Sequence, residues 1–208
     1  MENKLIEYLY SVEGNKVHYN KGEKDITSPG GIYRKAHPTA SVFTYIDNVA
    51  KSVGVVKDSV WWDKRDIRKI NSAIDLSEVT KYIEEFYKKY LAGAKLELFK
   101  GNAQIAMYSF YINSPKQAWK AVQQALIDMS MSGRLDVHVS DLSTVDGKFG
   151  GKTNRALAKV NCDDKLFSMY ICSAMKTRYT TLVAARPSKF LRYLRGWDNR
   201  VNSIVSLV

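Results

Sequence analysis

The sequence is poor in the residues that form disulfide frameworks and metal sites, and its apolar runs are short. It contains two cysteines, Cys162 and Cys172, in 208 residues. Ten residues span about 15 Å along a helix, which is too far for a disulfide. The three histidines, His18, His37 and His138, show no metal-ligand spacing with each other or with cysteine. No apolar run approaches the ~18 residues that a membrane helix needs. We therefore expect free thiols, no metal, no cofactor and no transmembrane segment.

A secretory signal is also missing. The first residues, MENKLIEYLYSVEG, contain neither a basic region nor a continuous apolar stretch of the kind that signal peptides have. Free thiols fit a reducing compartment. These features predict a protein that is made in the cytoplasm.

Acidic residues are few relative to basic ones. The chain has 32 Lys and Arg against 21 Asp and Glu, which gives a formal net charge of +11. From residue 176 to residue 208, seven Lys or Arg and one Asp supply +6 of this charge. Nucleic acid, a membrane surface and the bacterial envelope are the anionic partners that such a charge favours, and solvated helix faces are the simpler explanation.

Apolar residues, 45% of the chain, recur mostly at helical spacing. This pattern predicts helices near residues 42–53, 76–90, 107–112 and 115–129. Asp75 or Ser77 is expected to cap the second of them, and Ser114 with Pro115 is expected to begin the last. We expect a mainly helical, all-α protein in two tightly joined regions, residues 1–94 and 95–208.

The region around Glu13 has the pattern of a catalytic acid. Leu5, Leu9 and Val12 predict an N-terminal helix, and Gly14 is a typical helix terminator. Glu13 would then lie at the negative end of a helix and near its buried face. Both conditions favour the protonated carboxyl that a general acid needs. An exposed glutamate beside a helix-ending glycine is the simpler interpretation.

A short β-hairpin is predicted directly after this helix. Residues 17–27 contain a polar turn, Asn20-Lys21-Gly22, between apolar residues, and Pro29-Gly30-Gly31 turns the chain again. The hairpin would bring Glu23, Asp25 and Thr27 back towards the end of the helix.

A glycine-rich loop precedes a further helix. Asp146-Gly147-Lys148-Phe149-Gly150-Gly151-Lys152-Thr153 has three glycines, and Thr153 is expected to cap the helix that follows. The loop lacks the upstream glycine and the preceding strand of a nucleotide-binding P-loop. Nucleotide binding is therefore not expected.

These motifs together resemble glycoside hydrolase family 108, the lysozyme-like N-acetylmuramidases. Glu13-Gly14 and Gly31-Ile32-Tyr33 match the N-terminal half of the family, although Asn15 and Lys16 replace its usual Gly-Tyr. The C-terminal half of the family is matched by a peptidoglycan-binding-like segment with four signals: Asn113, Val122-Gln123, Asp146-Gly147 and Gly196-Trp197-Asp198-Asn199-Arg200.

The resemblance implies a lysozyme-like fold with a small hairpin beside the site, and a phage or prophage endolysin that cuts bacterial peptidoglycan. The bond would be the β-1,4 linkage between N-acetylmuramic acid and N-acetylglucosamine. Glu13 would protonate the leaving oxygen, while Asp25 would orient or deprotonate a water that Thr27 also holds. Either Glu23 or Asp25 is the second carboxylate, and the order Asp25-x-Thr27 favours Asp25. Glu23, Tyr33 and Asn113 are expected to bind substrate.

The resemblance leaves the mechanism and the route to the wall open. Carboxyl groups ~6.5–9.5 Å apart favour inversion, and a separation of ~5 Å favours retention. The expected monomer would act on the glycan strands of the wall after release or export.

Two other functions compete with this one. A lytic transglycosylase would use Glu13 alone and leave a 1,6-anhydro product. A non-enzymatic protein would bind envelope or nucleic acid through the basic C-terminal helices, with a steep salt dependence. The sequence has no helix-turn-helix and no RNA-recognition sheet, so nucleic acid is not the expected partner.

Overall fold

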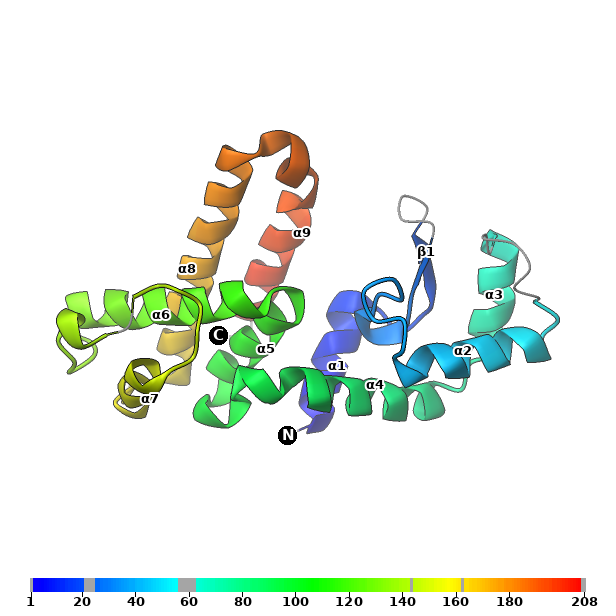
Figure 1. The fold of residues 1–208 in the computed structure, drawn as a ribbon, viewed down its shortest axis with the longest axis horizontal. Coiled ribbons are helices and arrows are strands. Elements are labelled where there is room, and N and C mark those ends of the chain that lie inside the picture. The colour runs from blue at the N-terminus through cyan, green and yellow to red at the C-terminus, as the bar shows by residue number, and fades with distance from the viewer. Residues whose placement is uncertain (1, 21–24, 56–62, 143, 162, 207–208) are drawn as a thin grey trace. The chain divides into compact units, whose positions relative to one another are not determined.

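The computed structural model describes residues 2–20, 25–55, 63–142, 144–161 and 163–206 (Figure 1). Its internal contacts divide the chain into two compact units, Met1–Tyr90 and Leu91–Val208. Within these ranges the chain is mainly helical and has one small antiparallel hairpin, which confirms the expected fold class.

The first unit combines the hairpin with four helices. Its elements are α1 (Glu2–Glu13), β1 (His18–Asn20), β2 (Asp25–Thr27), the 3-10 turn η1 (Pro29–Gly31), α2 (Ser41–Ser52), α3 (Lys64–Ala73) and α4 (Leu76–Tyr90).

The core of this unit lies where α1, α2, η1 and α4 meet. Leu9 is 2% exposed, and Ile46 and Ile83 are fully buried. Tyr10 of α1 and Thr80 of α4 share a hydrogen bond of 2.6 Å between their hydroxyl oxygens. α1 is therefore fixed to α4 by both apolar and polar contacts.

Two sequence signals work as expected here. The carboxylate of Asp75 caps α4 by accepting hydrogen bonds from the backbone N–H groups of Ser77 (2.8 Å) and Glu78 (3.2 Å). These bonds lower the pKa of Asp75, and the bond from Glu78 is the larger cause. Gly14 follows α1 in the left-handed region, with φ +86°.

α3 holds the start of the hairpin, and the sequence did not predict this helix. Asp63 caps it in a reciprocal arrangement with Asp66. The side chain of Asn71 accepts a hydrogen bond from the backbone N–H of Val17 (2.8 Å) and donates one to the carbonyl oxygen of Val17 (3.0 Å). One amide therefore anchors the strand entry to α3.

The second unit is built from helices and short 3-10 turns. Its elements are η2 (Leu91–Ala94), η3 (Leu96–Leu98), α5 (Gly101–Asn113), α6 (Pro115–Met131), η4 (Val139–Asp141), α7 (Gly151–Ala158), α8 (Asp164–Ala185) and α9 (Pro187–Val205).

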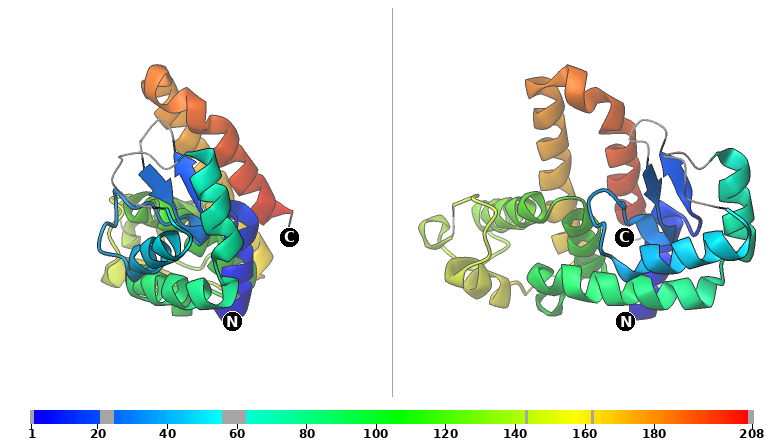
Figure 2. Two further views of the ribbon diagram at one scale, coloured as in Figure 1. Left: turned by 90° about the vertical axis from the view of Figure 1, so that its right-hand side faces the viewer. Right: turned by 45° about the vertical axis from the view of Figure 1, so that its right-hand side comes forward.

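α5 is the central helix of this unit and packs against α6 and α8. Met107 and Phe110 are fully buried, as the sequence predicted for this aromatic-rich segment. Asp164 of α8 caps α5 by accepting a hydrogen bond of 2.7 Å from the N–H of Asn102. α8 and α9 lie side by side in both sets of views (Figures 1 and 2).

The caps predicted for α6 and α7 have different outcomes in the structure. Ser114 does occupy the position before α6, with Pro115 as the first helical residue, but its side chain makes no capping hydrogen bond. The prediction that Thr153 caps α7 is wrong. α7 begins at Gly151 after Gly150, and Thr153 lies inside its first turn, 1% exposed. α7 therefore begins earlier than a cap at Thr153 would place its start.

The thiol of Cys172 on α8 is free and buried, and burial raises its pKa to about 12. Cys162 lies outside the described residues. In the part of the chain that the structure describes, no cluster of three His, Cys, Asp or Glu side chains has the arrangement of a metal site. No described helix combines the length and apolarity that crossing a membrane requires.

Candidate active site

Glu13 is the last residue of α1, and its half-buried side chain lies at the C-terminal end of that helix. The N–H of Gly14 still donates to the carbonyl oxygen of Tyr10 (2.9 Å), so the last helical turn, which contains Glu13, is complete. The position at the end of the helix agrees with the sequence prediction.

The double glycine of η1 packs directly on this helix end. The N–H of Gly30 donates to the carbonyl oxygen of Gly14 (2.9 Å). Gly30 and Gly31 have φ values of +71° and +82°. A Cβ atom at position 31 would lie 2.8 Å from Cγ and 2.9 Å from Cβ of Glu13. Only glycine therefore lets the loop backbone touch the glutamate side chain, and this contact restricts where the carboxyl can point.

The hairpin presents Asp25 and Thr27 on one face. Ile26 between them is 3% exposed and belongs to the core, so its two neighbours point the opposite way. Asp25 pairs with Asn20, and Thr27 pairs with His18. Oδ1 of Asp25 accepts a hydrogen bond from the N–H of Ile26 (2.8 Å), which orients the carboxylate. Glu23, the other candidate carboxylate, lies outside the described residues.

The structure adds His18 to this group. Because cross-strand partners share a face, His18 lies on the same side of the hairpin as Thr27. Its ring reaches back to the helix end, and Nε2 lies 3.3 Å from the place that a Cβ on Gly14 would take. An imidazole therefore lies beside the residue that follows Glu13. Alternation along the strand indicates which face of the hairpin His18 occupies, whereas its contact with Gly14 depends on the fold.

Tyr33 closes the base of the hairpin. It forms an isolated antiparallel bridge with Thr27, and its carbonyl oxygen accepts hydrogen bonds from the N–H groups of Ala36 (3.2 Å) and His37 (3.0 Å). Its half-buried side chain lies in the same unit as Glu13, Asp25 and Thr27.

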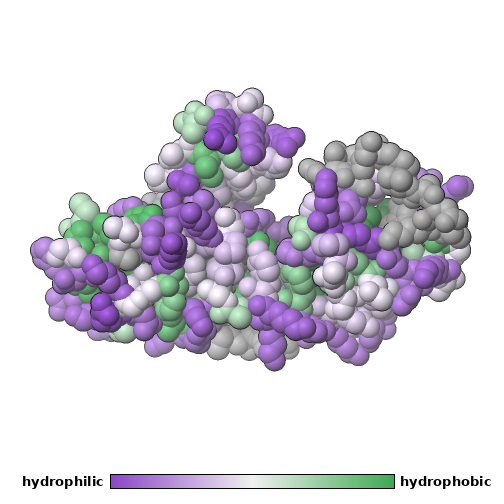
Figure 3. Space-filling view, in the orientation of Figure 1, coloured by the Kyte–Doolittle hydropathy of each residue, from purple (hydrophilic) through white to green (hydrophobic). Residues whose placement is uncertain are grey.

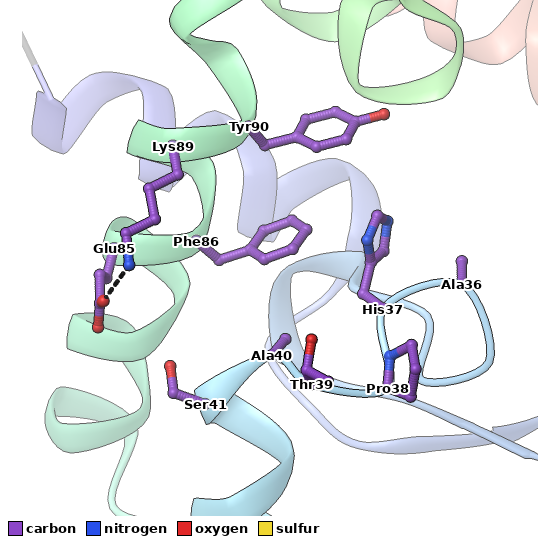
Figure 4. Close-up of a pocket in the computed structure, with 10 residues that line it drawn as sticks. All are labelled: Ala36, His37, Pro38, Thr39, Ala40, Ser41, Glu85, Phe86, Lys89 and Tyr90. Carbon is purple, nitrogen blue, oxygen red and sulfur yellow. Dashed lines mark hydrogen bonds and ion pairs between the residues drawn. The ribbon is translucent and has the colours of Figure 1, made fainter.

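The loop after Tyr33 leads to an aromatic pocket of about 550 Å³ (Figure 4). The ring centroids of Phe86 and Tyr90 on α4 are 5.6 Å apart and nearly parallel, and His37 meets both rings edge-on. Polar side chains surround these rings, including the ion pair between Lys89 and Glu85 (2.7 Å). Small-molecule pockets have this composition, in which apolar and aromatic side chains stand beside a few hydrogen-bonding groups.

Hydrogen bonds connect the pocket to the turn that follows Glu13. Tyr87, the neighbour of Phe86 on α4, donates a hydrogen bond of 2.7 Å from its hydroxyl to the carbonyl oxygen of Gly30. Gly30 in turn bonds Gly14. One chain of contacts therefore fixes the pocket helix, the double glycine and the catalytic glutamate candidate.

In the second unit, two of the family-like signals contact each other. The amide nitrogen of Gln123 donates to Oδ1 of Asp146 (2.8 Å) and to the carbonyl oxygen of Lys148 (3.0 Å). Its amide oxygen accepts from the N–H of Gly147 (2.8 Å). The bond from Gln123 is the main reason that the pKa of Asp146 is lowered, followed by the bond from the N–H of Lys148. Gln123 is thus a clamp that fixes the glycine-rich loop to α6.

The other two signals also meet. The side chain of Asn113 donates to the carbonyl oxygen of Ser109 (2.9 Å), and Arg200 of α9 donates to the same oxygen (3.5 Å). Trp197 stacks on Tyr179 of α8, with ring centroids 4.5 Å apart. These contacts give Asn113, Trp197 and Arg200 structural roles within the second unit. Asn113 lies in a different unit from Glu13, and its predicted substrate contact stays a prediction.

The comparisons with known proteins bear on this second unit. Residues 117–202 match the family described as a predicted peptidoglycan domain. The match supports a peptidoglycan-related protein, with peptidoglycan as its partner. Neither the curated proteins nor the solved structures contain a match to this chain.

Proposed function

We propose that this chain is a peptidoglycan hydrolase of the N-acetylmuramidase type, in which Glu13 is the general acid. The observation that carries the proposal is the packing of the Glu13 side chain against Gly31 at the end of α1. The peptidoglycan-related match in the second unit supports the choice of polymer.

The proposed reaction uses groups from the two sides of the helix end. Glu13 gives its proton to the oxygen of the leaving sugar as the glycosidic bond breaks. Asp25 accepts a proton from the attacking water or orients it, and Thr27 holds the same water. The aromatic pocket formed by His37, Phe86 and Tyr90 binds a neighbouring sugar ring of the glycan strand. The protein would therefore act on the cell wall, in the manner of an endolysin.

The decisive experiment is mass spectrometry of fragments released from purified peptidoglycan. Reducing muramic ends are expected from the hydrolase. Anhydro ends would identify a lytic transglycosylase, and a complete lack of fragments would identify a binding protein without enzymatic activity.

A pair of variants tests the role of Glu13. Glu13→Gln keeps the shape of the side chain but cannot donate the proton, so turnover should fall by ~10² or more while the thermal midpoint stays nearly unchanged. Glu7→Gln is the matched control, because Glu7 lies exposed on the same helix. If folded Glu13→Gln protein releases fragments at the rate of the control, Glu13 is not the general acid.

A further inference from the structure

A second pocket, of about 410 Å³, lies in the second unit between residues 136–141 and α7. Its volume is in the range of ~300–1,000 Å³ that small-molecule sites occupy. Six ionisable side chains line it: Lys152, Arg155 and Lys159 on one side, and Asp136, His138 and Asp141 on the other.

The three cations form one wall because of their spacing. Lys152 and Arg155 lie three residues apart on α7, and Lys159, which caps the end of this helix, follows four residues later, so the three side chains lie along one face. The opposite face of the helix is anchored by Thr153 and Leu157, which are 1% and 5% exposed. The helix is therefore held in one rotation, with its cations towards the pocket.

The carboxylates of the opposite wall form no ion pair with these cations. Among the described residues, no acidic side chain forms an ion pair with any of the three cations. The ammonium group of Lys159 makes only a long contact, 3.5 Å, with the carbonyl oxygen of Asp136. Three like charges on one helix face repel each other, and an anionic ligand between them would relieve that repulsion.

The second wall carries charges of the opposite sign. Asp136 and Asp141 are exposed carboxylates. Nδ1 of His138 accepts a hydrogen bond from the N–H of Ser140 (3.3 Å). A complementary ligand has carboxylates on one side and an amine on the other.

We propose that this pocket binds the peptide stem of peptidoglycan, through the carboxylates and the free amine of its diamino acid residue. The stem peptide is the part of the polymer that combines several carboxylates with an amine, whereas the unmodified glycan chain offers no amine. Lys152, Arg155 and Lys159 bind the carboxylates, and Asp136 with Asp141 binds the amine. The inference rests on the proposed peptidoglycan function, but it concerns the peptide and not the scissile glycan.

Titration of the full chain with the free tetrapeptide L-Ala-γ-D-Glu-meso-diaminopimelyl-D-Ala tests the proposal. The double variant Lys152→Gln/Arg155→Gln should bind this peptide at least ~10-fold more weakly, because charge-assisted hydrogen bonds are lost. The control is Lys189→Gln/Arg192→Gln, which removes the same charge from exposed positions on α9 and should bind normally. Equal weakening in both double variants, or no binding by the unmodified chain, would overturn the proposal.

Two chemically altered peptides test each wall separately. Amidation of the carboxylates should abolish binding to the unmodified chain. Acetylation of the amine of the diaminopimelyl residue should weaken binding, whereas acetylation of the N-terminal amine should not. The double variant Asp136→Asn/Asp141→Asn should then cause little further loss with the first of these peptides. An amidated peptide that binds as well as the original would rule out recognition of the carboxylates.

A parallel assay separates this inference from the proposed enzyme. Glycan strands freed of their stem peptides would be offered to the same protein preparations. Cleavage of these strands without any peptide binding refutes only the stem-peptide site. Peptide binding without cleavage of stripped or intact glycan refutes only the hydrolase.

Discussion

The contact between Gly31 and Glu13 makes the substitution Gly31→Ala a direct test of the active-site geometry. A methyl group at position 31 would lie 2.8 Å from Cγ and 3.0 Å from Oε2 of Glu13. It would also lie 2.9 Å from Cβ of Glu13, an atom that side-chain rotation cannot move. The loop and the end of α1 must therefore separate to accept the methyl group.

The expected loss in the free energy of unfolding has two parts, and a control variant separates them. Alanine at a left-handed position costs about 1–2 kcal/mol, and a residue forced into a packed site costs a further ~1–3 kcal/mol. Gly54 has a similar φ, +72°, but no described atom lies within 4 Å of a Cβ placed there. Gly54→Ala should therefore show only the first part. We expect Gly31→Ala to lower the free energy of unfolding by about 2–5 kcal/mol, against about 1–2 kcal/mol for Gly54→Ala.

Urea unfolding of both variants measures these free energies, and release of dye-labelled peptidoglycan fragments measures activity. Displacement of a catalytic group by about 1 Å lowers turnover by ~10²-fold. Activity should therefore fall by about that factor in Gly31→Ala under conditions where it is fully folded, and stay normal in Gly54→Ala. Equal losses of stability in the two variants would refute the close contact. Normal activity of folded Gly31→Ala would show that the contact does not position Glu13.

Four further predictions concern other parts of the chain. Asp25→Asn should depress fragment release more than Thr27→Val, and equal activities would remove Asp25 from the mechanism. Gly147→Ala should cost about 3 kcal/mol or more in urea unfolding, because its Cβ would lie 2.5 Å from the backbone oxygen of Lys116; a cost of only ~1 kcal/mol would show that the loop yields. Since the pKa of Asp146 is lowered on folding, its carboxylate stabilises the protein above its unfolded pKa of ~3.9. The stability advantage over Asp146→Asn should then be constant above about pH 5 and shrink as the pH falls through the folded pKa, and a constant difference down to pH 2 would contradict this. Because the pKa of Cys172 is raised to about 12, iodoacetamide at pH 8 should label it only on unfolding, and rapid native labelling in peptide maps would show that it is accessible.

Local sequence patterns predicted the elements whose signals lie within one or two turns. The apolar spacing and terminal Gly14 indicated α1, Asp75 indicated the start of α4, and Ser114-Pro115 indicated the start of α6. The sequence does contain a short signal for α3, since Ile67, Ile70 and Ile74 recur at helical spacing after the capping residue Asp63. It was missed because charged and polar residues outnumber these three in the segment.

The packing of the site depends on contacts between distant residues and could not be predicted in the same way. The sequence indicated Glu13 as a helix-ending glutamate. It contained no local sign that Gly31 would touch this side chain or that His18 would reach Gly14. Val122-Gln123 and Asp146-Gly147 are separate signals in the sequence. Only the fold shows that Gln123 and Asp146, which are 23 residues apart, form one clamp.

The Gln123 clamp also limits which substitutions the second unit can accept during evolution. Its amide donates two hydrogen bonds and accepts a third, which glutamate cannot do because it lacks the donor and asparagine cannot do because it is shorter. Gly147 has an equally strict requirement, since any side chain would collide with Lys116. Glutamine and glycine should therefore be kept or lost together in distant descendants of this unit, even where the surrounding helices have exchanged most of their apolar residues. That pair is a compact marker by which diverged copies of the unit can be found.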